Sequence, residues 1–162
     1  AILLSGRAFR SVRDSMPDPL HARISSQVRC VSSLLEHVVR PFEANGHKVD
    51  FYLSLYRETA PPERSLLLSL LQPRVMALTM MDGMGSTQLV TLAAALHAFL
   101  IECRLRSLQY AGGVIVTRYD LFFKQGLYPL FFPRSDPLLS DANAIDGFRF
   151  LFRESNGHWR HY

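Results

Sequence analysis

Apolar residues along this chain gather in four short stretches, each about as long as a β-strand. The stretches cover residues 1–4, 49–56, 74–80 and 114–116. Between them, apolar residues recur every three or four positions, which is the period of an amphipathic helix. These helical segments cover residues 19–42, 63–71 and 86–109. Strands that alternate with helices in this way predict an α/β fold: a doubly wound, mostly parallel sheet in βαβαβαβ order, with helices on both faces.

Capping and turn residues set the expected ends of the helices. Asp18 followed by Pro19 predicts an N-cap with proline at the first helical position. Pro41 has no backbone N–H and should kink or split the last turn of the first helix. Ser86 is the expected N-cap of the third helix, whose apolar residues occupy most of its circumference. A helix with that pattern is expected to be substantially buried.

The stretch from residue 112 to residue 120 is the most informative part of the chain. Three β-favouring apolar residues follow two glycines, and the hydrophobicity stops abruptly at Thr117, Arg118 and Asp120. Such a run predicts a strand buried on both faces. In open α/β sheets, ligands bind just beyond the carboxyl ends of such strands. Arg118 and Asp120 therefore indicate either a site for an anionic or metal-bound ligand, or a strand end that is simply solvated.

The first strand also ends in residues with two interpretations. Ser5, Gly6 and Arg7 form either a polar turn or a place where the backbone can approach a phosphate. Neither a GxGxxG fingerprint nor a GxxxxGK[ST] loop occurs in the chain. In a doubly wound sheet the first and fourth strands are neighbours where the strand order reverses. The shared edge would then carry two guanidinium groups able to hold a diphosphate, and one carboxylate able to bind Mg²⁺ or Mn²⁺.

Composition narrows the class of protein further. A chain of 162 residues, 48% hydrophobic and 20% charged, is expected to fold as a single domain over residues 1–162. The net charge of +4 comes from scattered arginines without a basic stripe, so nucleic acid is not an expected partner. The longest apolar segment, residues 89–101, is too short for a membrane span. Cys30 and Cys103 lie in helical segments without metal-ligand spacing and are expected to pack as small apolar side chains.

Three pieces of the chain resemble nucleotide-sugar glycosyltransferases of the GT-A type. They are SGRAFR at residues 5–10, GHKVDFYL at residues 46–53 and VIVTRYDL at residues 114–121. The likeness extends over about residues 1–125. The resemblance implies a Rossmann-like donor-binding fold and transfer of a glycosyl group from a nucleotide-diphosphate sugar. It implies donor contacts from Ser5, Gly6, Arg7, Thr117, Arg118 and Asp120.

The chain departs from that family's pattern in two places. The family's metal motif is Asp-x-Asp, whereas this chain has Arg118, Tyr119 and Asp120. Only Asp120 carries over as a contact to a metal ion, Mg²⁺ or Mn²⁺, or to the ribose. Little sequence follows the last expected strand, residues 148–152, so the acceptor-binding half is expected to be short or missing.

A second interpretation makes the chain a non-catalytic α/β subunit or interaction domain of a larger assembly. Its basis is an aromatic C-terminal region that would present an apolar surface to a protein partner. The residues are Phe122, Phe123, Phe131, Phe132, Phe148, Phe150 and Phe152. A third interpretation is a phosphate-ester or nucleotide-binding enzyme on a similar sheet, because this fold class carries many chemistries.

Overall fold

The computed structural model describes residues 1–6, 8, 19–83, 87–110, 113–131, 151–153 and 159–161. It contains two compact units, Ala1–Tyr128 and Pro129–Tyr162. The first unit holds a four-stranded sheet and its helices. In the second, β5 (Leu151–Arg153) and β6 (Trp159–His161) pair in an antiparallel fashion. A short helix, α5 (Tyr128–Phe131), includes the boundary between the units.

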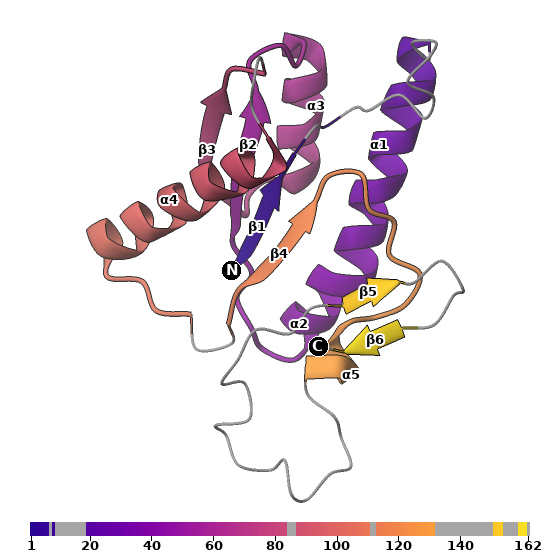
Figure 1. Ribbon diagram of the computed structural model, residues 1–162. Helices are drawn as coiled ribbons and strands as arrows, with labels where there is room; N and C mark the ends of the chain where they lie inside the picture. The colour runs from indigo at the N-terminus through magenta and orange to yellow at the C-terminus, as the bar shows by residue number, and fades with distance from the viewer. Residues whose placement is uncertain are drawn as a thin grey trace, which may run out of the picture. The chain divides into compact units, whose positions relative to one another are not determined.

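The sheet of the first unit is entirely parallel and has the order β3-β2-β1-β4 (Figure 1). Its strands are β1 (Ile2–Ser5), β2 (Phe51–Tyr56), β3 (Val75–Met81) and β4 (Ile115–Arg118). The chain adds β2 and β3 on one side of β1 and then returns to place β4 on the other side. The predicted α/β, doubly wound fold is confirmed, although the order of elements is not exactly the expected βαβαβαβ. The strand order reverses between β1 and β4.

Helices cover both faces of this sheet. They are α1 (Leu20–Leu34), a π-helical turn (Leu35–Val39), α2 (Arg40–Ala44), α3 (Pro61–Leu71) and α4 (Gln88–Arg106). In Figure 1, α4 crosses the near face in front of the sheet, and α3 lies behind it. The helix α1 contacts α3, so these two helices share a layer.

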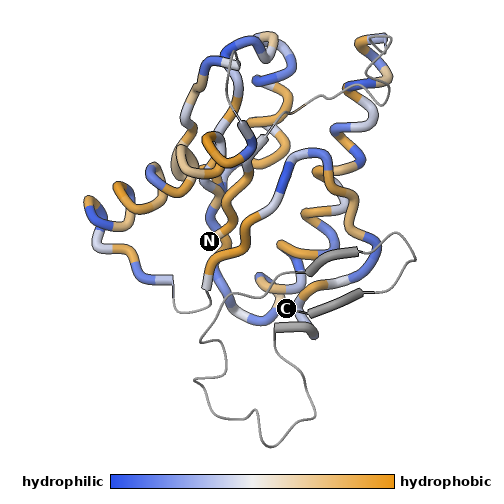
Figure 2. Tube along the Cα trace, in the orientation of Figure 1, coloured by the Kyte–Doolittle hydropathy of each residue, from blue (hydrophilic) through white to orange (hydrophobic). Residues whose placement is uncertain are grey.

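The core is built on the two central strands. Every residue of β1 is buried, and β2 is buried from Phe51 to Leu55. On the α4 face, Leu3 and Tyr52 pack against Ala95 with no exposed surface. The Tyr52 ring also meets Phe99 of α4 edge to face, with 5.1 Å between ring centroids. The apolar colour of these strands in Figure 2 matches that burial.

Pro41 has the effect that its chemistry predicts. The α-helix gives way to the π-helical turn at residues 35–39 and resumes at Arg40. Because Pro41 has no N–H, the carbonyl of His37, four residues earlier, lacks its usual α-helical donor. That carbonyl accepts a hydrogen bond from the N–H of Leu127, at 3.0 Å. The interruption therefore anchors the segment that follows β4.

The expected helix caps were placed slightly wrongly. Pro19 is itself the N-cap of α1, and Leu20 is the first helical residue, whereas Asp18 lies outside the described residues. Ser86 also lies outside them, and Thr87 caps α4. The Thr87 Oγ1 accepts a hydrogen bond from the N–H of Val90 at 3.3 Å. Hydroxyl residues in succession at a helix start make the capping position ambiguous from sequence.

Two expectations about burial were wrong. The helix α4 was expected to be substantially buried, but only Thr91 and Ala95 are, and Leu105 is 75% exposed. The fourth strand was expected to be buried on both faces, but Val116 is 52% exposed. Each error has its own cause. The strand β4 lies at the edge of the described sheet, and α4 packs on β1, β2 and β3 through one side only.

Within the described residues, α4 is the one helix long and apolar enough to cross a membrane. Helices that cover the sheet of an α/β protein can meet the same criterion. The absence of a membrane span therefore stays a prediction from the sequence.

The core assignment predicts a contrast between two leucines. Leu53 has no exposed surface, and Leu53→Ala should lower the free energy of unfolding by about 2–5 kcal/mol. Leu89 is 73% exposed, and Leu89→Ala should change it by no more than about 0.5 kcal/mol. Urea unfolding followed by circular dichroism measures both values. Equal losses would contradict the assignment of α4's outer side to the surface.

Candidate functional site

The residues expected at the shared sheet edge lie where the strand order reverses. Ser5, the last residue of β1, is in register with Arg118, the last residue of β4. Gly6 follows with φ +100°, a backbone conformation that favours glycine. A Cβ added to Gly6 would meet no described heavy atom within 4 Å, although Gly6 itself is buried. Arg7 lies outside the described residues, and its place in this group stays a prediction.

Arg118 and Asp120 form a forked ion pair just beyond β4. The Arg118 Nε donates to the Asp120 Oδ1 at 2.8 Å, and its Nη2 donates to the Oδ2. The Nη1 of Arg118 lies 3.5 Å from the Oε1 of Gln88, the first residue of α4. The side chains of Arg118 and Asp120 are 35% and 25% exposed. A cation that is oriented by a carboxylate therefore stands at the surface of the sheet edge.

Thr117 and Tyr119, which alternate with Arg118 and Asp120 along the chain, are buried. Tyr119 is 2% exposed, and its main-chain carbonyl accepts a hydrogen bond from the Gln27 Nε2 of α1 at 3.0 Å. Burial raises the pKa of the Tyr119 phenol well above its ordinary value, opposed by the nearby backbone of Ser54. The Oγ1 of Thr117 is buried and has no hydrogen-bond partner among the residues that the structure describes. Long-range packing therefore fixes the strand end that carries Arg118.

At the same end of the sheet, the residues that follow β2 and β3 make polar contacts with one another. At the end of β2, Arg57 pairs with Asp82 at 3.1 Å, and both side chains are largely exposed. The N–H of Gly83 donates to the Glu58 Oε1 at 2.8 Å. A Cβ on Gly83 would come within 2.8 Å of the Glu58 carboxylate, so a larger residue there would displace the end of the Glu58 side chain. These contacts tie the ends of β2 and β3 together.

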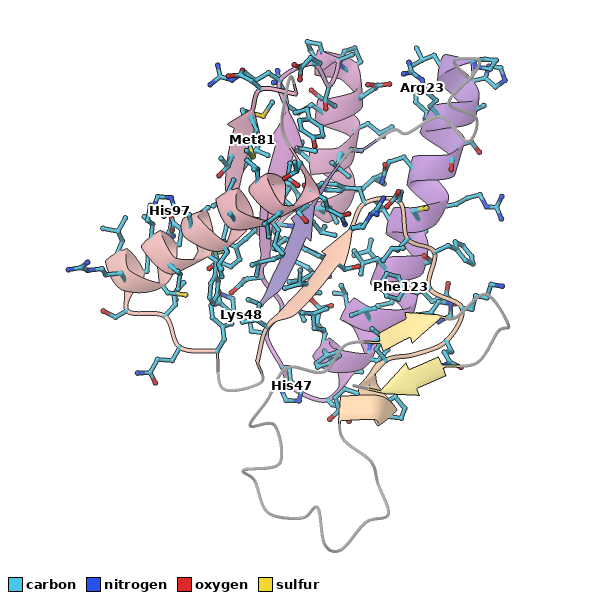
Figure 3. The ribbon with its side chains drawn as sticks, in the orientation of Figure 1. Arg23, His47, Lys48, Met81, His97 and Phe123 are labelled. Atoms are coloured by element: carbon cyan, nitrogen blue, oxygen red, sulfur yellow. The ribbon has the colours of Figure 1, made fainter. Side chains whose placement is uncertain are left out.

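A third ion pair joins the starts of two helices. Arg23 of α1, labelled in Figure 3, lies with its Nη2 3.4 Å from the Oε1 of Glu63 on α3. Glu63 is 5% exposed, and its Oε2 also accepts a hydrogen bond from the N–H of Ala60 at 3.3 Å. This carboxylate therefore caps α3 and attaches it to α1. Its role is structural.

The sequence also predicted a metal contact from Asp120. Both carboxylate oxygens of Asp120 accept hydrogen bonds from Arg118. Among the described residues, no group of three histidine, cysteine, aspartate or glutamate side chains is arranged to hold a metal ion. Mg²⁺ needs several oxygen ligands in near-octahedral geometry. The described arrangement does not fit a divalent ion without a change at Asp120.

A buried polar network at the amino ends of the strands was not predicted from the sequence. Asp50 is 3% exposed, and its Oδ2 accepts a hydrogen bond from the Tyr110 hydroxyl at 2.8 Å. The Tyr110 hydroxyl also lies 2.8 Å from that of Tyr52. Burial, together with Tyr52 and Asp50, raises the pKa of the Tyr110 phenol. The sequence signal was one acidic residue at the start of an otherwise apolar strand.

This network borders a cavity of about 290 Å³. The cavity is lined by residues that include Phe42, His47, Lys48, Asp50 and Tyr110. His47 and Lys48, which Figure 3 labels, precede β2 and so mark the amino ends of the strands. The Lys48 Nζ lies 3.2 Å from the Asp50 carboxylate and supplies its counter-charge. The cavity therefore lies at the edge opposite to the Arg118–Asp120 pair.

The fold is therefore that of a doubly wound, parallel α/β domain. Polar residues lie at the carboxyl ends of β1 and β4, where the strand order reverses. Comparisons with protein-family models, with curated proteins and with solved structures found no match.

Two hydroxyl substitutions should have opposite effects on stability. Thr117→Val removes a buried hydroxyl that has no described partner, and should leave stability unchanged or raise it by about 1 kcal/mol. Ser54→Ala removes a hydrogen bond of 2.8 Å to the carbonyl of Thr91, and should lower stability by about 1 kcal/mol. Denaturant unfolding compares the two variants. A larger loss for Thr117→Val would mean that its hydroxyl is satisfied in solution.

Proposed function

We propose that the sheet edge at β1 and β4 binds a nucleotide-diphosphate sugar, and that the domain is glycosyltransferase-like. The observation that carries the proposal is the register of Ser5 with Arg118, which brings Gly6 next to the Arg118–Asp120 pair. In doubly wound sheets, ligands bind in the crevice beside the strand-order reversal. An exposed guanidinium there favours an anionic ligand.

Arg118 has hydrogen-bonding capacity left for a phosphate. A guanidinium carries five N–H donors in a planar fork. Two of them point to Asp120 and a third points to Gln88. The other two, one on each terminal nitrogen, are available to a phosphate oxygen. Asp120 thus acts as a positioning residue for Arg118.

The same geometry favours departure of a diphosphate. When the glycosyl bond breaks, negative charge develops on the leaving phosphate oxygen. A guanidinium that is already oriented stabilises this charge without reorganising. A divalent ion, where one is bound, supplies the same kind of charge stabilisation. Among the described residues, Arg118 is the cationic side chain that we propose for this role.

The interaction-domain alternative rests on a different observation. Phe122 is 51% exposed, and the Arg29 guanidinium lies 5.8 Å from the centre of its ring. Phe123 is half-buried, and its N–H donates to the Ser33 Oγ at 3.0 Å. The other aromatic side chains of the C-terminal region lie outside the part of the chain whose burial is described. A partner surface through that region stays a proposal.

The donor-site proposal predicts selective loss of binding when Arg118 is changed. Calorimetric titration with UDP- and GDP-sugars should show binding to the unaltered chain. Arg118→Gln removes a charge-assisted contact and should weaken binding by at least about tenfold. Arg57→Gln is the matched control, because Arg57 lies at the same sheet edge in a different ion pair. Equal weakening by both variants, or no binding of any donor to folded protein, would remove the proposal.

A second titration tests the role of a metal ion. Because Arg118 occupies both oxygens of Asp120, donor binding should persist in EDTA, within about threefold of the affinity in Mn²⁺. The measurement compares dissociation constants in the two buffers. Binding seen only with Mn²⁺ would show that Asp120 leaves Arg118 to ligate the ion.

A further inference from the structure

Helix α1 packs against the point where the chain leaves β4. Its residues Cys30, Val31 and Leu34 line a small crevice together with Arg118 and Tyr119. The strand ends at Arg118, and the next two residues form a turn. The helix α1 therefore borders the turn that carries the Arg118–Asp120 pair.

Two side chains of α1 form hydrogen bonds with the main chain of the described segment after β4. The Gln27 Nε2 donates to the carbonyl oxygen of Tyr119 at 3.0 Å. The Ser33 Oγ accepts a hydrogen bond from the N–H of Phe123, also at 3.0 Å. The first of these contacts is made to the residue that separates the two members of the ion pair. The second is made three residues beyond the pair.

The contact between Gln27 and Tyr119 is buried. Gln27 is 4% exposed, and Tyr119 is 2% exposed. A buried carbonyl that loses its donor is costly, so it turns toward water or toward another donor. Removal of the Gln27 amide should therefore allow the Tyr119 carbonyl to rotate away from its present direction.

Such a rotation would displace Asp120. The Tyr119 carbonyl oxygen lies in the same peptide plane as the N and Cα of Asp120, so the three atoms move together. Both carboxylate oxygens of Asp120 accept hydrogen bonds from Arg118. A forked pair of this kind depends on the mutual orientation of two planar groups. The direction of the Tyr119 carbonyl therefore affects the geometry of the ion pair.

The orientation of Arg118 depends mainly on this fork. Its Nε lies 2.8 Å from the Asp120 Oδ1, whereas its Nη1 lies 3.5 Å from the Gln88 Oε1. Most N–H···O hydrogen bonds in proteins span about 2.7–3.2 Å. The contact with Gln88 is thus the weaker one, and it cannot by itself hold the guanidinium in one orientation.

We propose that Gln27 is a positioning residue for Arg118. Its hydrogen bond to the Tyr119 carbonyl keeps Asp120 in place, and Asp120 in turn orients the guanidinium. The consequence for a ligand rests on the proposed function: an Arg118 released from its fork is less preorganised and binds a diphosphate less tightly. The effect on the ion pair itself requires no ligand, so it is measured separately.

Hydrogen exchange of the Arg118 Nε–H with water, followed by NMR in isotope-labelled protein, tests the effect on the ion pair. Gln27→Met keeps the length of the side chain but removes its N–H groups, and it should accelerate this exchange by at least about tenfold. Asp120→Ala removes the carboxylate and gives the reference rate for an unpaired Arg118. The Nε–H of Arg74, which is bonded to Glu43 at 2.6 Å, should exchange at an unchanged rate.

Two further variants make the comparison specific. Ser33→Ala is the matched control, because it removes the other hydrogen bond from α1 to the segment after β4 and should leave the Arg118 proton unchanged. Gln27→Asn keeps an amide on a shorter side chain that does not reach the carbonyl, and it should accelerate exchange as Gln27→Met does. It also serves as the test if Gln27→Met does not fold. Circular dichroism verifies that each variant is folded.

Calorimetric titration with UDP- and GDP-sugars tests the consequence for the ligand. Gln27→Met should weaken donor binding by at least about threefold. In the Asp120→Ala chain it should cause no further loss, because Gln27 acts through Asp120. A general loosening of the fold would instead weaken binding equally in both backgrounds, and that result would contradict the proposal.

Three exchange results would also overturn the proposal. The first is an Arg118 proton that exchanges as fast in the unaltered chain as in Asp120→Ala. The second is a folded Gln27 variant in which exchange is as slow as in the unaltered chain. The third is equal acceleration by Ser33→Ala. If no donor binds to any folded chain, the proposed function fails, and the exchange rates still decide whether Gln27 positions Arg118.

Discussion

The parallel pairing of β1 with both β2 and β4 is the constraint on which the rest of the structure depends. Leu3 and Leu4 have no exposed surface, because strands flank them on both sides and helices cover both faces. The pairing with β4 sets the register that brings Ser5 to Arg118. It also fixes where the sheet stops, and therefore which apolar residues stay uncovered. The polar strand ends and the exposure of Val116 are two consequences of one strand position.

The order of the helices and strands in the sheet could be predicted from the sequence, but the burial of α4 and β4 could not. Each strand is a compact apolar stretch between helical segments, so type and order follow from the local pattern. The burial of α4 and β4 depends on how many neighbours each receives. Val116 lies in an apolar run that is typical of a central strand, yet none of the described strands pairs with β4 on its outer side. Local pattern carries no information about that missing neighbour.

The candidate site was partly predictable for the same reason. Strand order alone placed Ser5, Gly6, Thr117, Arg118 and Asp120 at one edge. The fork between Arg118 and Asp120 was missed, since two oppositely charged residues two positions apart meet only in a particular turn. The contact of Gln27 with Tyr119 spans 92 positions and has no local signal. Such contacts arise from packing after the strands have been placed.

The reversed strand order has a consequence for synthesis of the chain. The outer edge of β1 is completed only by residues 115–118, more than a hundred positions later. A nascent polypeptide on the ribosome can assemble β1, β2 and β3 well before β4 emerges from the exit tunnel. During that interval the backbone groups of β1 stay open to pairing with other chains. Synthesis of the segment between β3 and β4 thus sets how long this edge of β1 lacks its partner strand.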